Sequence, residues 1–442
     1  MKNKINLLVL PSLVCTLILH SCCYYGFATD PAETSAPLNT PGLVTNILTV
    51  DSAIRLALEN NPELSISSMQ VDAAAGRAYQ ARLWSNPELS LSAEDWPTSG
   101  GGFPNAKKLV GVAQTLPFPG KKKLDRQIGA SGTRLSEAEL SLRRIELIRD
   151  VKIAFYQVLA AERLVEVAGN LVAVAESSAA TARKRVAAGA AADPEQIRAE
   201  IPLEQARTEL SGFERELAAA RQTLALLLGR PDLDHAPVSG SLAEKANRTL
   251  LDFGPEQWMA CHPSVLVAKS SRDRAELELR RARLEPYPDM RLGLSGGRES
   301  GRDGGGIVQF GVSLPLPIID RSKGKKQEMQ ANARIAQADQ IVVEHRLLRE
   351  WGTSSRRFRT AMEQVANYQE RILPKADEAL RLVQSGFEHG KFGFMDLLDT
   401  QRTAAEVRLA YQKKLLELNV AQAELEFLKA GPGLSQPDKS QP

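Results

Sequence analysis

Side chains that could perform chemistry are few in this sequence and lie far apart. Beyond the N-terminal segment the histidines are His235, His262, His345 and His389, and no two of them have the spacing of a metal-binding motif. Cys261 is the single cysteine of the main body, so no internal disulfide can form there. The seven methionines are equally scattered, which argues against a relay of soft-metal sites. We therefore expect no enzyme, no cofactor and no bound metal.

Charged residues do gather at two glycine-containing turns. Gly189 precedes Asp193, and Gly390 precedes Asp396, each where one long helical stretch should end and another begin. Glycine readily adopts the left-handed conformation that terminates a helix. A carboxylate stabilises the N-terminus of the helix that follows. Helix capping alone would explain both aspartates.

The composition excludes several classes of protein. Of 442 residues, 43% are hydrophobic and 25% are charged, which excludes an intrinsically disordered chain. The formal net charge is only +3, so we expect no nucleic-acid partner. Aromatic residues make up 5% while alanine is abundant, and this composition favours long, closely packed helices.

The N-terminus is typical of an export signal over residues 1–28. Two lysines precede a mostly apolar run, Ile5–Leu19, which is too short for a comfortable membrane span. Two cleavage sites remain open. Leu19-His20-Ser21-Cys22 resembles a lipoprotein box, whose cleavage would leave Cys22 lipidated, and the other site follows Ala28.

The main body consists of two similar halves. Three pairs of landmarks recur at shifts of 201, 201 and 198 residues: Asn61-Pro62-Glu63-Leu64 with His262-Pro263-Ser264-Val265, Pro87–Leu91 with Pro288–Leu292, and Leu116-Pro117-Phe118-Pro119 with Leu314-Pro315-Leu316-Pro317. Chance rarely preserves one register across so many landmarks, so we infer an internal duplication. The two repeats span 48–240 and 241–432, with a linker at 29–47 and a disordered tail at 433–442.

Each half is expected to contain a helix, two strands and two long helical stretches. Alternating apolar and polar residues predict the strands, at 88–95 and 108–116 and then at 289–295 and 307–314. Glycine-rich segments, among them Gly296–Gly306, should connect them. The long helical stretches are expected at 135–188 and 195–228, then at 328–388 and 395–429.

The helical stretches carry their own markers. Asn61-Pro62 should break the opening helix, Ser52–Trp84, and Pro374 should interrupt the third long stretch. A helix of about 50 residues is roughly 75 Å long, and no single core can bury that length. Such helices need coiled-coil partners. The apolar residues of 407–428 accordingly follow a spacing close to a heptad.

Four strands of about ten residues with one apolar face match the pattern of outer-membrane β-segments. A bilayer disfavours unpaired strand edges, and the smallest membrane barrels have about eight strands. Strands that span a membrane must therefore be pooled from several chains. The alternative is two soluble hairpins on a helical protein.

The order and duplication of these motifs resemble the outer membrane efflux proteins of the TolC family over essentially the whole mature chain. Residues 48–64 look like that family's opening helix. Leu116-Pro117-Phe118-Pro119-Gly120 and Leu314–Pro317 resemble its strand-to-helix exits, and Gly390–Gln401 resembles its periplasmic helical turn. Val186–Gln196 is most similar to the branch that works with heavy-metal resistance-nodulation-division (RND) pumps.

The resemblance implies an α+β membrane protein with four transmembrane β-strands per chain. A homotrimer would form a twelve-stranded β-barrel in outer-membrane lipid and a long α-helical coiled-coil barrel in the periplasm. The implied function is a passive exit duct of a tripartite efflux system, with an RND pump and a periplasmic adaptor as partners and heavy-metal cations as cargo. The adaptor would dock at the two helical tips, where Ala190-Ala191-Ala192 departs from the family's more polar turn.

Threefold symmetry would also turn the charges of the second tip into rings. Asp396, Asp399 and Arg402 lie at or just beyond it. Rings of carboxylates favour cations, and neighbouring basic groups can hold them shut. We therefore expect a gate at these residues, with Gly189, Asp193 and Gly390 forming the rest of the tips.

Two other functions remain open. One is the outer-membrane duct of type I protein secretion, which belongs to the same structural class. The other is a non-pore periplasmic coiled-coil scaffold, against which the four amphipathic strands argue.

Overall fold

The structure is a computed structural model that describes residues 47–95, 103, 106–190, 192–242, 246–252, 254–299 and 304–430. All of them belong to one unit, residues 47–442. The export signal, Cys22, the linker up to residue 46 and the tail at 433–442 lie outside the described residues. Among the described helices, none has an apolar stretch that could cross a bilayer.

The opening helix is broken where the sequence predicts it. Helix α2 spans Val50–Asn60 and α3 spans Pro62–Arg82, with Asn61 between them. The Asn61 side-chain oxygen accepts hydrogen bonds from the backbone N–H groups of Glu63 (3.0 Å) and Leu64 (3.1 Å). Pro62 occupies the first turn of α3, where its missing N–H costs no hydrogen bond. Asn61 therefore starts the new helix.

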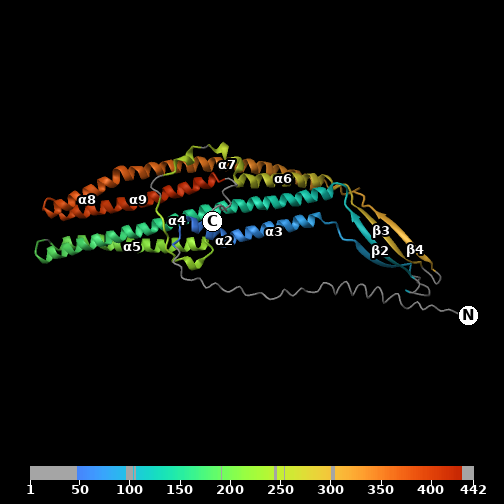
Figure 1. The fold of residues 1–442 in the computed structure, drawn as a ribbon, viewed down its shortest axis with the longest axis horizontal. Helices are drawn as coiled ribbons and strands as arrows, with labels where there is room; N and C mark the ends of the chain where they lie inside the picture. The colour runs from blue at the N-terminus through green and yellow to red at the C-terminus, as the bar shows by residue number, and fades with distance from the viewer. Residues whose placement is uncertain are drawn as a thin grey trace, which may run out of the picture. The chain divides into compact units, whose positions relative to one another are not determined.

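Long helices follow in each half and run side by side (Figure 1). The described helices of this kind are α4 (Lys121–Ala187), α5 (Asp193–Leu227), α6 (Pro263–Arg283), α7 (Lys323–Asn367), α8 (Leu373–Glu388) and α9 (Phe394–Leu428). Helices α4 and α5 pack together, as do α8 and α9. The apolar seam predicted in α9 is buried at Tyr411, Leu415, Leu418, Leu425 and Leu428.

Helix α4 starts at Lys121, and the expected start near residue 135 was wrong. Polar residues dominate this first part, so it lacks the apolar periodicity that would predict a helix. Tertiary contacts replace that signal: Asp125 accepts a hydrogen bond from Arg281 of α6 at 2.8 Å. Gly129 packs so closely on Ala78 of α3 that a Cβ atom would lie 2.8 Å from that residue's Cα. Helix α7 likewise starts at Lys323, before the expected residue 328.

The interruption predicted at Pro374 takes the form of a π-helical segment, Tyr368–Ile372, between α7 and α8. Proline has no N–H to donate, and its ring collides with the carbonyl one turn earlier. A wider helical turn accommodates both effects.

The four strands form one antiparallel sheet in the order β1-β2-β3-β4. They span Glu88–Glu94, Lys107–Leu116, Met290–Arg298 and Gly306–Ser313, close to the predicted ranges. One face carries large apolar side chains that are exposed: Leu89, Leu91, Val110, Val112, Leu294, Val308, Phe310 and Val312. The opposite face carries mostly small or polar side chains, with Leu109 and Ile307 as apolar exceptions. Strands β1 and β4 form the two edges of the sheet.

The sequence placed a connection over Gly296–Gly306, but β3 continues through Gly296 and Gly297 to Arg298. Glycine weakens strands, which is why the pattern indicated a turn. Here the pairing itself requires glycine, because a Cβ atom at Gly297 would collide with the carbonyl of Lys108 on β2.

His262 starts helix α6, as Asn61 starts α3. The side chain is fully buried, and its Nδ1 atom accepts a hydrogen bond from the Ser264 N–H at 3.2 Å. Its ring meets those of Trp258 and Phe427 edge-on, with centroids 6.0 and 5.5 Å away. This burial lowers the pKa of His262 to about 4. The neutral imidazole therefore acts as the helix cap.

We expect His262 to make the free energy of unfolding decrease as the pH is lowered. The pKa of His262 in the folded protein lies below the usual 6.5. Its contribution to the free energy of unfolding is therefore complete above pH 6.5 and is lost as the pH falls towards 4. The loss should reach up to about 3 kcal/mol per chain. His262→Asn, which copies the Asn61 cap, should make the apparent melting temperature depend less on pH between pH 6.5 and 4.

Circular dichroism of the purified protein would measure this effect. His345→Asn is the matched control, because His345 is exposed and its replacement should leave the pH profile unchanged. Equal acid sensitivity in the wild type and His262→Asn would contradict the prediction.

Candidate functional site

The first tip joins α4 to α5 through Gly189. This glycine has a φ of 69°, in the left-handed region, and its N–H donates to the Val186 carbonyl at 2.9 Å. The Ala190 N–H donates to the Arg185 carbonyl at 2.9 Å, which completes a glycine-type helix end. Asp193 is the first residue of α5, and no side chain caps this helix by a hydrogen bond. Asp193 thus contributes its charge near the helix N-terminus rather than a cap.

Ion pairs join the two helices behind the first tip. Arg183 of α4 contacts Glu200 of α5 at 3.0 Å, and Arg185 contacts Glu195 at 3.2 Å. The hydrogen bond from Arg183 lowers the pKa of the Glu200 carboxyl. Residues 190–192 are alanines in the sequence, so the charged residues of this tip are those of α4 and α5.

The second tip joins α8 to α9 through Gly390, whose φ is 72°. Its N–H donates to Phe387 at 3.0 Å, and the Lys391 N–H donates to Gly386 at 2.7 Å. The carboxylate of Asp396 accepts a hydrogen bond from the Gly393 N–H at 2.9 Å. Asp396 therefore caps α9 directly, whereas Asp193 makes no such bond in α5.

Asp399 and Arg402 lie one turn further along α9 and pair with each other. The Arg402 guanidinium is 3.4 Å from Asp399 and 3.7 Å from Glu406, on the same helix. All three side chains are about two-thirds exposed. Exposed pairs of this kind contribute little to stability, so they are free to exchange partners. The structure does not bring Asp193 or Gly189 into contact with this group.

Two contacts that were not predicted from the sequence connect the hairpins behind their tips. Phe394, the first residue of α9, is buried in a cluster with Leu203 and four alanines: Ala175, Ala179, Ala182 and Ala199. The Ser178 hydroxyl of α4 donates to the Gln401 side chain of α9 at 3.0 Å. Alanines at 175, 179 and 182 recur at helical spacing and could have indicated a packing seam, but no local pattern marks the Ser178–Gln401 pair.

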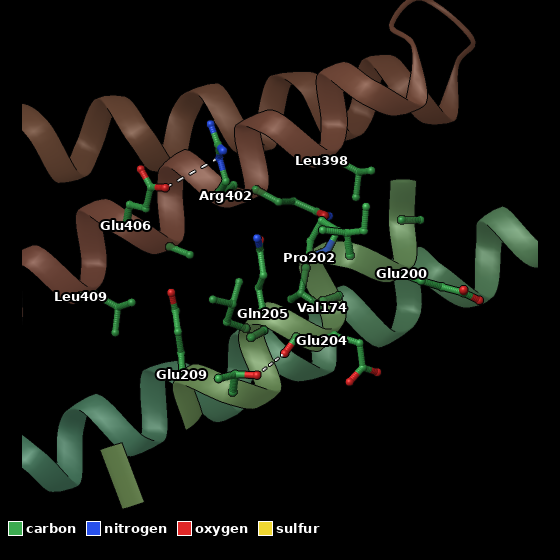
Figure 2. A pocket seen from close by; sticks show the side chains of 18 of the residues that line it. Val174, Glu200, Pro202, Glu204, Gln205, Glu209, Leu398, Arg402, Glu406 and Leu409 are labelled. Carbon is green, nitrogen blue, oxygen red and sulfur yellow. Dashed lines mark hydrogen bonds and ion pairs between the residues drawn. The ribbon is translucent and has the colours of Figure 1, made fainter. Parts of the chain in front are cut away.

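A groove of about 820 Å³ lies between the α4–α5 pair and α9, next to this junction (Figure 2). Its floor is apolar, with Val174, Pro202 and Leu398 among the lining residues. Carboxylates surround the floor: Glu200, Glu204, Glu209 and Glu406. Arg402 and Glu406 line it from α9 and form an ion pair with each other (Figure 2). Within the described ranges, no three histidine, cysteine or acidic side chains cluster in a way that could hold a metal ion.

A four-stranded sheet with one exposed apolar face, joined to paired long helices with glycine tips, defines a class of outer-membrane channel. The family model of outer membrane efflux proteins matches residues 53–230 and 255–431, and the chain belongs to this family. The family points to a protein that is not an enzyme and that resides in the outer membrane.

The chain is similar to characterised proteins over most of its length. It is 30% identical to the cobalt-zinc-cadmium resistance protein CzcC of Cupriavidus metallidurans, covering 82% of this chain and 85% of CzcC. It is 25% identical to the outer membrane protein OprJ of Pseudomonas aeruginosa, covering 85% of this chain and 83% of OprJ.

Solved structures show the same fold. The MtrE outer membrane channel of Neisseria gonorrhoeae superposes with a TM-score of 0.73 at 20% identity, covering 87% of this chain and 89% of MtrE. CusC superposes with a TM-score of 0.69 at 18% identity, covering 86% of this chain and 92% of CusC.

The two acidic residues of the second tip should differ in their effect on local stability. Asp396→Ala removes the cap of α9 and should cost about 1 kcal/mol, equivalent to roughly fivefold faster amide exchange in 393–398. Asp399→Ala removes only an exposed pair and should change exchange by less than about twofold. Hydrogen exchange read by mass spectrometry would measure both, and equal effects would contradict the assignment of the cap.

Proposed function

We propose that this protein is the outer-membrane duct of a tripartite heavy-metal efflux system and that it acts as a homotrimer. The observation that carries the proposal is the 30% identity to CzcC across 82% of the chain. A second metal-resistance protein, the nickel-cobalt-cadmium resistance protein NccC of Alcaligenes xylosoxydans xylosoxydans, is 23% identical over 61% of the chain. Divalent heavy-metal cations are therefore the proposed cargo.

The physical case for a membrane-spanning oligomer rests on the sheet. Its exposed apolar face suits contact with lipid, whereas most side chains of the opposite face are small or polar. Its edge strands leave backbone groups that a bilayer does not tolerate unpaired. Three copies would supply twelve strands, enough to close a barrel. The paired helices would then extend into the periplasm as a coiled-coil barrel.

The tips are the proposed contact with the periplasmic adaptor, which in turn would connect the duct to an inner-membrane RND pump. Energy would come from the pump, because a duct needs only a water-filled path and an opening. The groove beside Leu398 has an apolar floor and acidic margins, which suit a basic amphipathic helix of such an adaptor.

Deleting the gene should sensitise the source bacterium to cobalt, zinc and cadmium, because exit across the outer membrane is lost. Expression of the wild-type chain should restore growth at the original metal concentrations. Minimal inhibitory concentrations would measure this, with a protein-secretion assay run on the same strains. Unchanged metal tolerance together with lost secretion of a protein would support a type I secretion duct instead.

We propose further that Asp396, Asp399 and Arg402 form the gate at the second tip, with Gly189, Asp193 and Gly390 completing the tips. Asp396 and Asp399 lie within one turn of α9, and the Asp399–Arg402 pair is exposed enough to exchange partners across a threefold axis. Opening would separate α9 from α4, and the contacts that resist this are the Phe394 cluster and the Ser178–Gln401 hydrogen bond.

Replacing Asp396 and Asp399 together by Ala should raise single-channel conductance in planar bilayers, because the carboxylate rings that neighbouring basic groups could hold shut would be gone. A several-fold increase in the closed-state conductance is expected. The matched control is Glu166→Ala on α4, which removes an exposed ion pair of the same spacing, Arg163–Glu166, away from the second tip. Unchanged conductance in the double variant would remove the gate and leave helix capping as the role of Asp396.

A further inference from the structure

An apolar segment, residues 314–319, leaves β4 at the end of the sheet that joins the helices (Figure 1). Its large side chains are exposed, with Leu316 at 68% and Ile318 at 70%. They directly follow Phe310 and Val312 of the exposed apolar face. The segment therefore extends the apolar surface of the sheet towards the helices.

The length of β4 indicates the depth at which this segment would lie in a membrane. The strand has 8 residues. At about 3.3 Å per residue and a tilt of about 40°, such a strand rises roughly 20 Å, whereas the apolar band of an outer-membrane protein is about 25 Å tall. In the membrane orientation of the proposed function, on which this step rests, residues 314–319 supply the missing depth. They would lie where the acyl chains of the periplasmic leaflet meet the headgroups.

The exit from β2 shows how such a segment can be held by its own chain. Phe118 stacks on Tyr287, with ring centroids 4.7 Å apart, and its N–H donates to the Asp289 carboxylate at 2.8 Å. For residues 314–319, the hydrogen bond found in the described part of the chain is a local one, from the Ile318 N–H to the Leu316 carbonyl at 2.9 Å. The second exit is therefore available to a partner from outside the chain.

Basic residues follow this segment directly, at the start of α7. Arg321, Lys323, Lys325 and Lys326 fall within six positions, and all four are exposed. Lys325 pairs with Glu328 at 3.3 Å, whereas the other three form no ion pair with any residue that the structure describes. Their positive charges can therefore attract an anion from outside the chain.

The carboxylates beside this basic group already have partners. Asp320 accepts a hydrogen bond from the Ser322 N–H at 2.7 Å. Asp289, at the other exit, pairs with Lys121 at 2.9 Å. The excess of positive charge at the start of α7 is thus not neutralised by these neighbours.

We propose that the segment after β4 and the start of α7 together bind anionic phospholipids of the periplasmic leaflet. Leu316 and Ile318 contact the acyl chains, and Arg321, Lys323 and Lys326 bind the headgroup phosphates. Surfaces of this kind combine buried apolar area with electrostatic attraction to anionic lipid. The partner is therefore a lipid that carries both an acyl chain and a negative charge.

Aromatic residues support the same depth in the membrane. Trp84 lies between α3 and β1, Tyr287 lies between α6 and β3, and both are at least half exposed. Tryptophan and tyrosine are enriched where a membrane meets water. The apolar sheet, these aromatic side chains and the basic start of α7 thus follow the order of acyl chains, interface and headgroups.

Native mass spectrometry of the full-length protein in detergent tests the proposal. Titration with phosphatidylglycerol and with phosphatidylcholine of identical acyl chains would measure both affinities, and the wild type should prefer phosphatidylglycerol. Arg321→Gln with Lys326→Gln should weaken phosphatidylglycerol binding roughly twentyfold and leave phosphatidylcholine binding unchanged, because each basic residue near an anionic surface contributes about fivefold. Leu316→Ser with Ile318→Ser should weaken the binding of both lipids alike, because acyl chains do not distinguish the headgroups.

Lys375→Gln with Arg381→Gln is the matched control, because it removes one lysine and one arginine that are exposed on α8. This variant should leave both affinities unchanged. An undiminished preference for phosphatidylglycerol in the Arg321→Gln, Lys326→Gln variant, or an equal loss in the control, would overturn the proposal. Displacement of phosphatidylglycerol by an equal concentration of glycerol 3-phosphate would also overturn it, because a free phosphate would then be sufficient.

A second copy of this chain is the competing occupant of the segment. In that case the Leu316→Ser, Ile318→Ser variant would dissociate into monomers, and the wild type would show no preference between the two lipids. Metal tolerance separates these outcomes from the proposed function. A wild type that restores tolerance without preferring phosphatidylglycerol overturns the lipid surface alone, whereas one that prefers phosphatidylglycerol without restoring tolerance overturns the metal duct alone.

Discussion

Backbone hydrogen bonding at the sheet edges is the constraint on which the rest of this structure depends. In the four-stranded sheet, the backbone groups of the inner strands are hydrogen-bonded to neighbouring strands on both sides. The edge strands β1 and β4 each have a neighbour on one side only, so their outward-facing backbone groups have no strand to pair with, and one face of the sheet is apolar and exposed. Water could solvate those groups, whereas a lipid bilayer could not. The apolar face and the open edges therefore make opposing demands on a single chain, and the proposed association of several chains would satisfy both.

The long helices must also bury apolar surface, and they do so by packing against one another. Helices as long as α4 cannot surround a core, so they bury narrow seams along one another. Small residues make this possible: alanines line the junction behind the tips, and Gly129 lets α4 approach α3 closely. The low aromatic content and abundant alanine are consequences of this packing, rather than of several compact domains.

Much of the fold could be predicted because its signals are local. The break at Asn61, the interruption at Pro374 and the four strands each follow from proline geometry or from alternating side chains. The start of α4 and the extension of β3 through Gly297 could not, because both depend on contacts with distant segments. The same holds for the tips: capping by Asp396 follows from local spacing, whereas the Ser178–Gln401 bond joins residues far apart in the chain.

The π-helical segment at Tyr368–Ile372 has a consequence for how the two hairpins can be compared. An α-helix advances by about 100° per residue, so one additional residue in a turn changes the angular phase of everything that follows. The side chains of α8 therefore point in different directions around the helix axis from those they would have if α7 continued without interruption. Helix α4 spans the corresponding part of the first half without such an offset. The two helical hairpins can thus direct different side chains towards the same neighbour, even where their sequences share one pattern of apolar residues.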